Sequence, residues 1–103
     1  MTDTVLPPEQ CATMGEVRAG VDATDRELVA LLTRRYGYMK AAARIKTERE
    51  AVRDETRKAA VIAAAVRQAD ANDLPTSDIA DLWDRLVESS IRYELAEWDR
   101  LRT

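Results

Sequence analysis

Apolar residues recur along the sequence at the three- and four-residue steps that are typical of amphipathic helices. The longest such stretch covers about residues 14–48 and contains no proline. Its apolar positions are Val17, Val21, Thr24, Leu28, Leu31, Leu32, Met39, Ala42, Ala43 and Ile45. A helix over residues 17–46 would be roughly 45 Å long at 1.5 Å per residue. Because so short a chain cannot bury such a rod against itself alone, the pattern predicts that this helix is the scaffold of a dimer.

Two further helices are expected after the long one. The polar residues 47–53 lose the helical period and predict a loop, and Asp54 is a good N-cap for a second helix over about 54–72. Pro75 cannot continue that helix, so a third helix is expected over about 76–101. Its apolar face consists of Ile79, Leu82, Trp83, Leu86, Val87, Ile91, Leu95 and Trp98. The pattern therefore predicts an all-α protein with three helices per chain.

The composition agrees with a helical domain. The 103 residues are 46% hydrophobic but only 5% aromatic, so the core must consist mainly of Ala, Leu, Val and Ile, which suit close-packed helices. Gly and Pro are too few for the regular turns of an all-β domain. We expect residues 1–13 to form a flexible N-terminal lead-in and residues 14–103 to form a single domain.

Charge and cysteine usage exclude several classes of function. The net charge is −3 and no basic block occurs, which argues against a nucleic-acid partner. A chain without histidine and with Cys11 as its single cysteine has no His-based nucleophile, and it argues against a zinc site and against an intrachain disulfide. Residues 1–10 lack the features of a signal peptide, and no apolar run reaches the ~18 residues of a membrane span. We therefore expect a cytoplasmic protein with no metal, no cofactor and no membrane partner.

Cations on the long helix suggest an anion-binding site. Arg35 and Lys46 are eleven residues apart, which places them within about 20° of the same face and about 16 Å apart along the axis. Two long side chains that lean toward each other can hold the two ends of a small anion. Arg18 lies about 260° around the helix from Arg35, so a shared site would have to receive it from a second copy of the helix. Taken singly, each of these cations is more often a solvated surface residue.

Polar residues on the other two helices offer further candidates. Ser90 and Glu94 lie one turn apart beside the apolar face of the third helix. Burial there favours a neutral Glu94, which can donate a hydrogen bond that a carboxylate cannot. The alternative is that Glu94 lies at the edge of the face and pairs with a neighbouring cation. Asp54 and Arg57 at the start of the second helix are either a cap with a solvated charge or part of an anion site, since a first-turn Arg opposes the helix dipole.

The ordered set of these residues resembles the AroQ-type chorismate mutases over about residues 10–100. The resemblance is carried by D-x-x-L-V-x-L-L-x-x-R at 25–35, by Lys46 and by V-R-D-x-x-R at 52–57. Two segments, P-E-x-C at 8–11 and RRYGYMKAAARIK at 34–46, are similar to the isochorismate-pyruvate lyase of salicylate biosynthesis. The resemblance implies an intertwined all-helical homodimer with two equivalent, shared active sites that bind a dicarboxylate substrate.

The resemblance also implies a role for each cation. Arg18 would reach from the partner subunit to one carboxylate of the substrate, and Arg35 would hold the other. Lys46 would contact the ether oxygen and a carboxylate, and Arg57 would add to the positive field. These groups suit a carboxylate because Arg binds it through two parallel hydrogen bonds and Lys acts as a point charge.

Uncharged and acidic groups complete the implied site. Asp54 would accept a hydrogen bond from the ring hydroxyl, and Ser90 would contact a carboxylate. Glu94 stands where bacterial members often carry Gln and would donate to the ether oxygen in its protonated form. Lys58 departs from the pattern, because many mutases have there a Glu that accepts from the ring hydroxyl, and a cation cannot accept that bond.

Two observations favour a mutase over a lyase. Glu94 differs from the Gln of the similar lyase, and the V-R-D-x-x-R motif at 52–57 is a mutase feature. The expected function is therefore that of a chorismate mutase, an isomerase of aromatic amino acid biosynthesis in the shikimate pathway. It rearranges chorismate to prephenate by orientation and electrostatics, with no nucleophile and no metal. The alternatives are an isochorismate-pyruvate lyase of salicylate or siderophore biosynthesis and a catalytically inactive helical dimerisation module.

Overall fold

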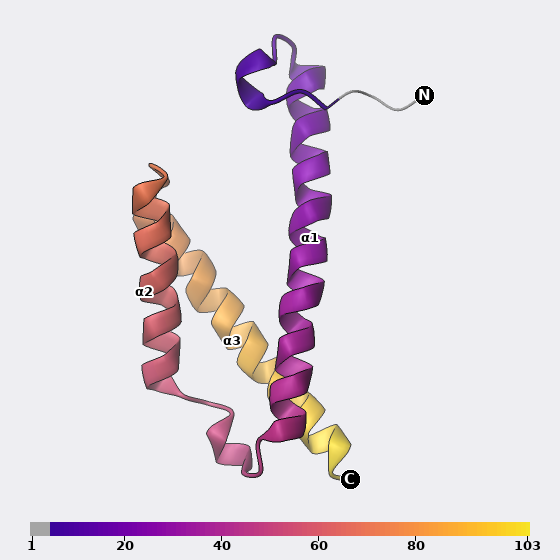
Figure 1. Ribbon diagram of the computed structural model, residues 1–103, viewed down its shortest axis with the longest axis vertical. Coiled ribbons are helices and arrows are strands. Elements are labelled where there is room, and N and C mark those ends of the chain that lie inside the picture. Colours follow the sequence, from indigo (N-terminus) through magenta and orange to yellow (C-terminus); the bar gives the residue numbers. More distant parts are fainter. Residues whose placement is uncertain (1–4) are drawn as a thin grey trace. The chain divides into compact units, whose positions relative to one another are not determined.

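The structure is a computed structural model that describes residues 5–103. These residues form three α-helices, α1 (Met14–Ile45), α2 (Glu55–Ala71) and α3 (Thr76–Leu101), and two 3-10 helices, η1 (Pro8–Gln10) and η2 (Arg49–Ala51) (Figure 1). No strand occurs in this described part of the chain. The predicted all-α class and the three helices are confirmed. Of the predicted lead-in over 1–13, residues 1–4 lie outside the described part.

Helix α1 begins with a capping box at Thr13, in agreement with the predicted start near residue 14. The Thr13 hydroxyl accepts from the Glu16 amide at 3.2 Å, and the Glu16 carboxylate accepts from the Ala12 and Thr13 amides, both at 2.9 Å. The bond from the Ala12 amide is the largest cause of the lowered pKa of Glu16. The C-terminus of α1 lies at Ile45, about three residues before the predicted end near residue 48.

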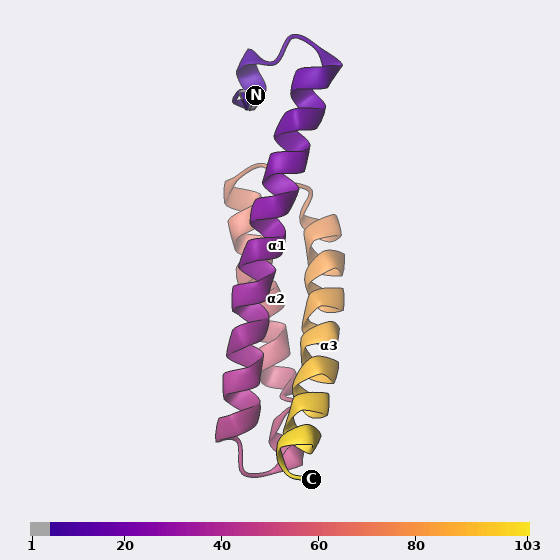
Figure 2. The same cartoon turned by 90° about the vertical axis from the view of Figure 1, so that its right-hand side faces the viewer.

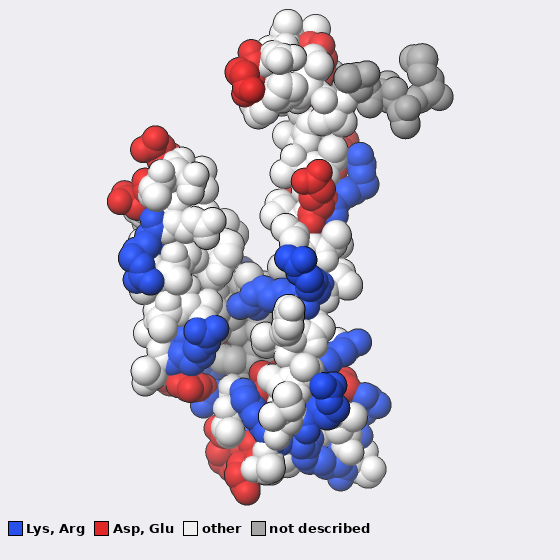
Figure 3. Space-filling model, in the orientation of Figure 1, with Lys and Arg blue, Asp and Glu red and all other residues white. Residues whose placement is uncertain are grey.

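The contacts divide the chain into two units, residues 1–35 and 36–103, and α1 runs through the boundary. In the first unit, the segment before α1 folds back so that Leu6 lies beside Gly20. Between them is a mostly apolar hollow of about 480 Å³, to which Val17 and Val21 contribute. Uncharged residues cover much of the visible surface of this unit in Figure 3.

The apolar face of α1 in the first unit is uncovered in the single chain. Val21, Leu28 and Leu31 are each about half exposed, at 52%, 51% and 52%. These residues belong to the set that the three- and four-residue periodicity identified as a packing face. Several half-exposed apolar residues in one row on a helix are typical of a surface that packs against another element or another chain.

In the second unit, α2 and α3 pack side by side and run in opposite directions (Figures 1 and 2). Their core is a cluster of Val52, Val87 and Ile91, against which Val61, Leu95 and Trp98 pack. The last turns of α1 are joined to α3 by an edge-to-face contact between Tyr36 and Tyr93, whose ring centroids are 4.9 Å apart. These contacts fix α3 as the central element of this unit.

The turn between α2 and α3 is a Schellman motif. The Leu74 amide donates to the Ala69 carbonyl at 2.9 Å, and the Asp73 amide donates to the Asp70 carbonyl at 3.2 Å. Asp73 has a φ of 56°, in the left-handed region where Gly is more common. The predicted ends of α2 and α3 are thus confirmed to within one residue.

Candidate active site

The second unit brings together two of the predicted site residues, Lys46 and Glu94. Lys46 follows directly after α1, and its ammonium Nζ lies 2.8 Å from Oε2 of Glu94 in α3. The Glu94 side chain is 5% exposed and that of Lys46 is 30% exposed. Oε2 receives no well-directed hydrogen bond from the described residues, so this contact is an ion pair in its geometry. The sequence is compatible with two states of Glu94, a buried neutral donor or the partner of a cation, and the structure shows both burial and a cationic neighbour.

The unequal exposure of Lys46 and Glu94 has a chemical consequence. A buried carboxylate is unfavourable unless a cation compensates its charge. Lys46 is 30% exposed and can therefore contact an incoming anion. Such an anion would share the positive charge of Lys46 and leave the buried carboxyl group of Glu94 less compensated.

Ser90 lies one helical turn before Glu94 and is also buried, at 3% exposure. Its hydroxyl donates to the Leu86 carbonyl of the same helix at 2.7 Å. This bond to the preceding turn is common for a Ser within a helix. Ser90 and Glu94 are the polar members of the buried set in α3.

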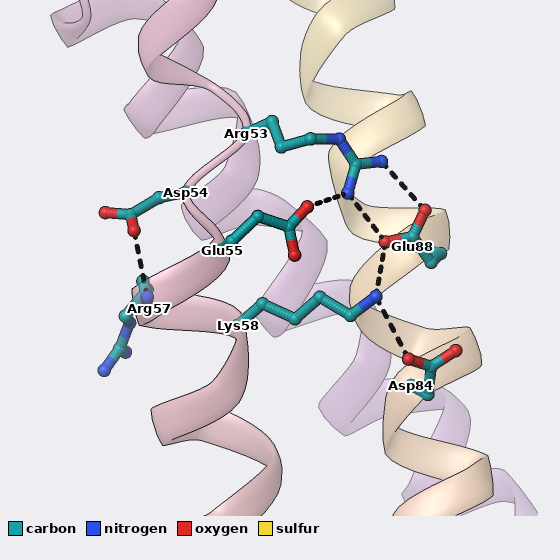
Figure 4. A network of polar contacts seen from close by, with 7 residues as sticks. All are labelled: Arg53, Asp54, Glu55, Arg57, Lys58, Asp84 and Glu88. Atoms are coloured by element: carbon teal, nitrogen blue, oxygen red, sulfur yellow. Dashed lines mark hydrogen bonds and ion pairs between the residues drawn. The ribbon is translucent and has the colours of Figure 1, made fainter.

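Asp54 is the N-cap of α2, as the sequence predicted. Its carboxylate accepts from the Arg57 amide at 2.9 Å. The side chain of Arg57 is exposed and points away from Lys58 and Glu88 (Figure 4). The cap is therefore confirmed, while the substrate contacts of Asp54 and Arg57 stay predictions.

A charged cluster joins α2 and the residues before it to α3, and it was not predicted from the sequence. Lys58 Nζ lies 2.8 Å from a Glu88 oxygen and 3.0 Å from an Asp84 oxygen. Arg53 donates to both Glu88 oxygens, at 2.8 and 3.0 Å, and to Glu55 at 2.8 Å (Figure 4). The cluster binds the ammonium of Lys58 to two carboxylates of α3.

The cluster changes the titration of its members. Hydrogen bonds from Arg53, and next from Lys58, lower the pKa of Glu88 to about 2. The bond to Glu88 is the largest cause of the raised pKa of Lys58 and of the raised pKa of Arg53. The sequence held a signal for it, because Asp84 and Glu88 are four residues apart and so share a face of α3.

The other two predicted cations lie in the first unit. Arg18 is an exposed residue in the first turns of α1, and Arg35 is the last residue of that unit. Lys46, Asp54, Arg57, Ser90 and Glu94 all lie in the second unit. A joint site of Arg18 and Arg35 with these five residues stays a prediction.

The described part of the chain was searched for a metal-binding cluster and for a membrane-spanning helix. Residues 5–103 contain no group of three or more acidic or cysteine side chains arranged to hold a metal ion. None of the helices formed by these residues is both long and apolar enough to cross a membrane.

A comparison with known proteins decides the family. The sequence profile of the family described as chorismate mutase type II matches residues 17–95, which include every predicted site residue from Arg18 to Glu94. The chain belongs to this family. It is also 30% identical over 95 residues to the isochorismate pyruvate lyase of Pseudomonas aeruginosa, an alignment that covers 92% of this chain and 94% of the relative.

The resemblance seen in the sequence is thereby confirmed. The chorismate mutase type II family is a family of enzymes, and membership implies a chorismate-like small molecule as the substrate. The family description names an isomerase, and the relative's name describes a lyase.

Proposed function

We propose that this chorismate mutase type II family member rearranges chorismate to prephenate. The observation that carries the proposal is the Lys46–Glu94 pair, a partly exposed ammonium 2.8 Å from a buried carboxyl group, inside the matched segment. The rearrangement is unimolecular and breaks an ether bond while a carbon–carbon bond forms. Such a reaction needs an oriented substrate and donors at the oxygen on which charge develops.

The proposed mechanism begins with charge compensation. Arg35 and the partner's copy of Arg18 hold the two substrate carboxylates and select the folded conformer. The Lys46 ammonium contacts the substrate, and Glu94 acts in the protonated form that the family resemblance implies. Lys46 and protonated Glu94 then donate to the ether oxygen as its bond to carbon breaks.

The remaining predicted residues support binding. Ser90 contacts a carboxylate, Arg57 adds positive field, and Asp54 accepts from the ring hydroxyl while it caps α2. Lys58 takes no part in this binding in our proposal, because Glu88 and Asp84 already hold its ammonium.

The proposed assembly is an intertwined homodimer. The uncovered apolar face of α1, with Val21, Leu28 and Leu31 about half exposed, supports a second copy as the covering partner. Each active site would then combine Arg18 of one subunit with the other residues of its partner. We place this enzyme of a single functional domain in the cytoplasm, where the free thiol of Cys11 would stay reduced.

The second candidate function is that of an isochorismate-pyruvate lyase. It is supported by the 30% identity to the Pseudomonas aeruginosa enzyme over nearly the whole length of both chains. The same cationic residues would bind isochorismate. Cleavage of its ether bond, with transfer of a ring hydrogen to the methylene carbon of the departing enolpyruvyl group, would release pyruvate and leave salicylate. The products formed from chorismate and from isochorismate distinguish the two enzymes, and a protein that forms neither product would be an inactive dimerisation module.

A further inference from the structure

The backbone of Lys46 is held by two side chains from the end of α3. The Trp98 indole N–H donates to the Lys46 carbonyl at 3.0 Å. Arg102 Nη2 donates to the same oxygen at 2.7 Å, and its Nη1 donates to the Ala43 carbonyl at 3.0 Å. All of these residues lie in the second unit.

These bonds complete the C-terminus of α1. The last carbonyls of an α-helix have no partner within the helix, and they form the negative end of its dipole. Arg102 brings a positive charge and two donors to this end, and Trp98 brings a third donor. These contacts also favour the end of α1 at Ile45, because they occupy the carbonyls of Ala43 and Lys46, which a longer helix would use for its own hydrogen bonds.

The two donors are themselves fixed in place. The Arg102 guanidinium lies over the Trp98 ring, 4.1 Å from the ring centroid, and Nη1 also donates to the Trp98 carbonyl at 3.2 Å. The Trp98 ring packs against the cluster of Val52, Val87 and Ile91. The hold on Lys46 is therefore anchored in the core of the second unit.

Helix α3 thus contacts both ends of Lys46. Glu94 meets its ammonium at 2.8 Å, and Trp98, one turn later on the same helix, binds its carbonyl. We propose that Trp98 and Arg102 are positioning residues that fix the backbone of Lys46 so that its ammonium stays at the reacting ether oxygen. This inference rests on the proposed function for its effect on turnover, but the hold on the carbonyl is testable without turnover.

The kinetic test is a double-mutant cycle with Lys46. We expect Trp98→Phe and Arg102→Ala each to lower kcat by about tenfold, because a misplaced catalytic group costs one to two orders of magnitude. Arg102→Lys should recover part of the loss, since one donor and the charge remain. In a Lys46→Ala background, Arg102→Ala should cause no further loss. An equal loss in both backgrounds, or no loss in either, would overturn the proposal.

A matched control separates positioning from general damage to α3. Arg100→Ala removes an exposed Arg two residues earlier, whose partner is Glu97 on the same helix, and it should leave kcat unchanged. Thermal unfolding of each variant shows whether the fold persists. Because Trp98→Phe keeps an aromatic ring in the core, it provides a test that does not depend on the Arg102 variants.

A spectroscopic test works even if the wild-type enzyme converts neither substrate. We expect the Trp98 indole proton to be protected from hydrogen exchange, and the carbonyl ¹³C shift of Lys46 to move in Trp98→Phe and in Arg102→Ala. A freely exchanging indole proton with an unchanged Lys46 shift would overturn the hold on the carbonyl. Absence of turnover with an intact hold would instead contradict the proposed function alone.

Discussion

The ammonium of Lys46 lies 2.8 Å from the carboxyl oxygen Oε2 of Glu94, yet the two side chains differ sharply in exposure, at 30% and 5%. Removal of the two partners should therefore have different effects. Removal of Glu94 leaves a cation that can still reach water, whereas removal of Lys46 leaves a buried acid without its counterion. Stability and activity should both reflect this difference.

Lys46→Ala should destabilise the protein. A buried charge that loses its partner costs on the order of 3–5 kcal/mol, or less where the group takes up a proton. The measurement is urea unfolding at neutral pH, followed by circular dichroism. Lys46→Ala combined with Glu94→Gln should recover most of the loss, because a neutral amide needs no counterion. An equally unstable double variant would contradict this account of the pair.

Glu94→Gln should change how activity depends on pH. In the proposed mechanism, Glu94 donates only when protonated, so the rate should fall as rising pH removes that proton. Gln donates at every pH, and the variant should show a flat profile. The measurement is kcat against pH for both proteins. A wild-type profile that is already flat would rule out a protonated Glu94 as the donor.

Glu88→Gln should reduce stability in a pH-dependent way. Hydrogen bonds from Arg53 and Lys58 lower the pKa of Glu88 from 4.5 to about 2 in the folded protein. A lowered folded pKa adds stability that is fully present above the unfolded value and is lost as pH falls through the folded one. The difference between wild type and Glu88→Gln should therefore be largest above about pH 4.5 and should shrink toward pH 2.

Thermal unfolding at a series of pH values measures this difference. Glu27→Gln is the matched control, because it removes an exposed acid of α1 outside the cluster. A gap between wild type and Glu88→Gln that persists unchanged to pH 2 would show that the cluster acts through packing and not through charge.

Hybrid dimers test the shared active site. If Arg18 acts across the subunit interface, mixing inactive Arg18→Ala and Arg35→Ala proteins should restore activity. One of the two sites in each hybrid then contains both arginines. The measurement is turnover after subunit exchange, which two different affinity tags verify. Mixing two separate Arg18→Ala preparations is the control, and no recovery after verified exchange argues against a site built from two subunits.

The sequence predicted the helices well because their signals are local. Periodicity, the Asp54 cap and Pro75 place α2 and α3 within one residue of their observed ends. The end of α1 was placed about three residues too late, because the side chains that hold its last carbonyls, Trp98 and Arg102, lie more than fifty residues away. No local pattern carries such a contact.

The candidate site was predictable only in part, for the same reason. Glu94 was recognised beside the apolar face of α3. Helical spacing alone could not determine whether its side chain is a buried neutral donor or is paired with a cation. Lys58 was recognised as unusual, yet its bonds to Glu88 and Asp84 depend on how α2 pairs with α3. Spatial relations between residues of one helix could thus be predicted more readily than contacts between residues of two different helices.

The most direct test of the proposed function is the product formed by the purified protein from chorismate and, separately, from isochorismate. We predict prephenate from chorismate, with a loss of about 10²-fold or more in kcat for Lys46→Ala because a donor to the ether oxygen is missing. Salicylate with pyruvate from isochorismate, and no prephenate from chorismate, would contradict the mutase and establish the lyase.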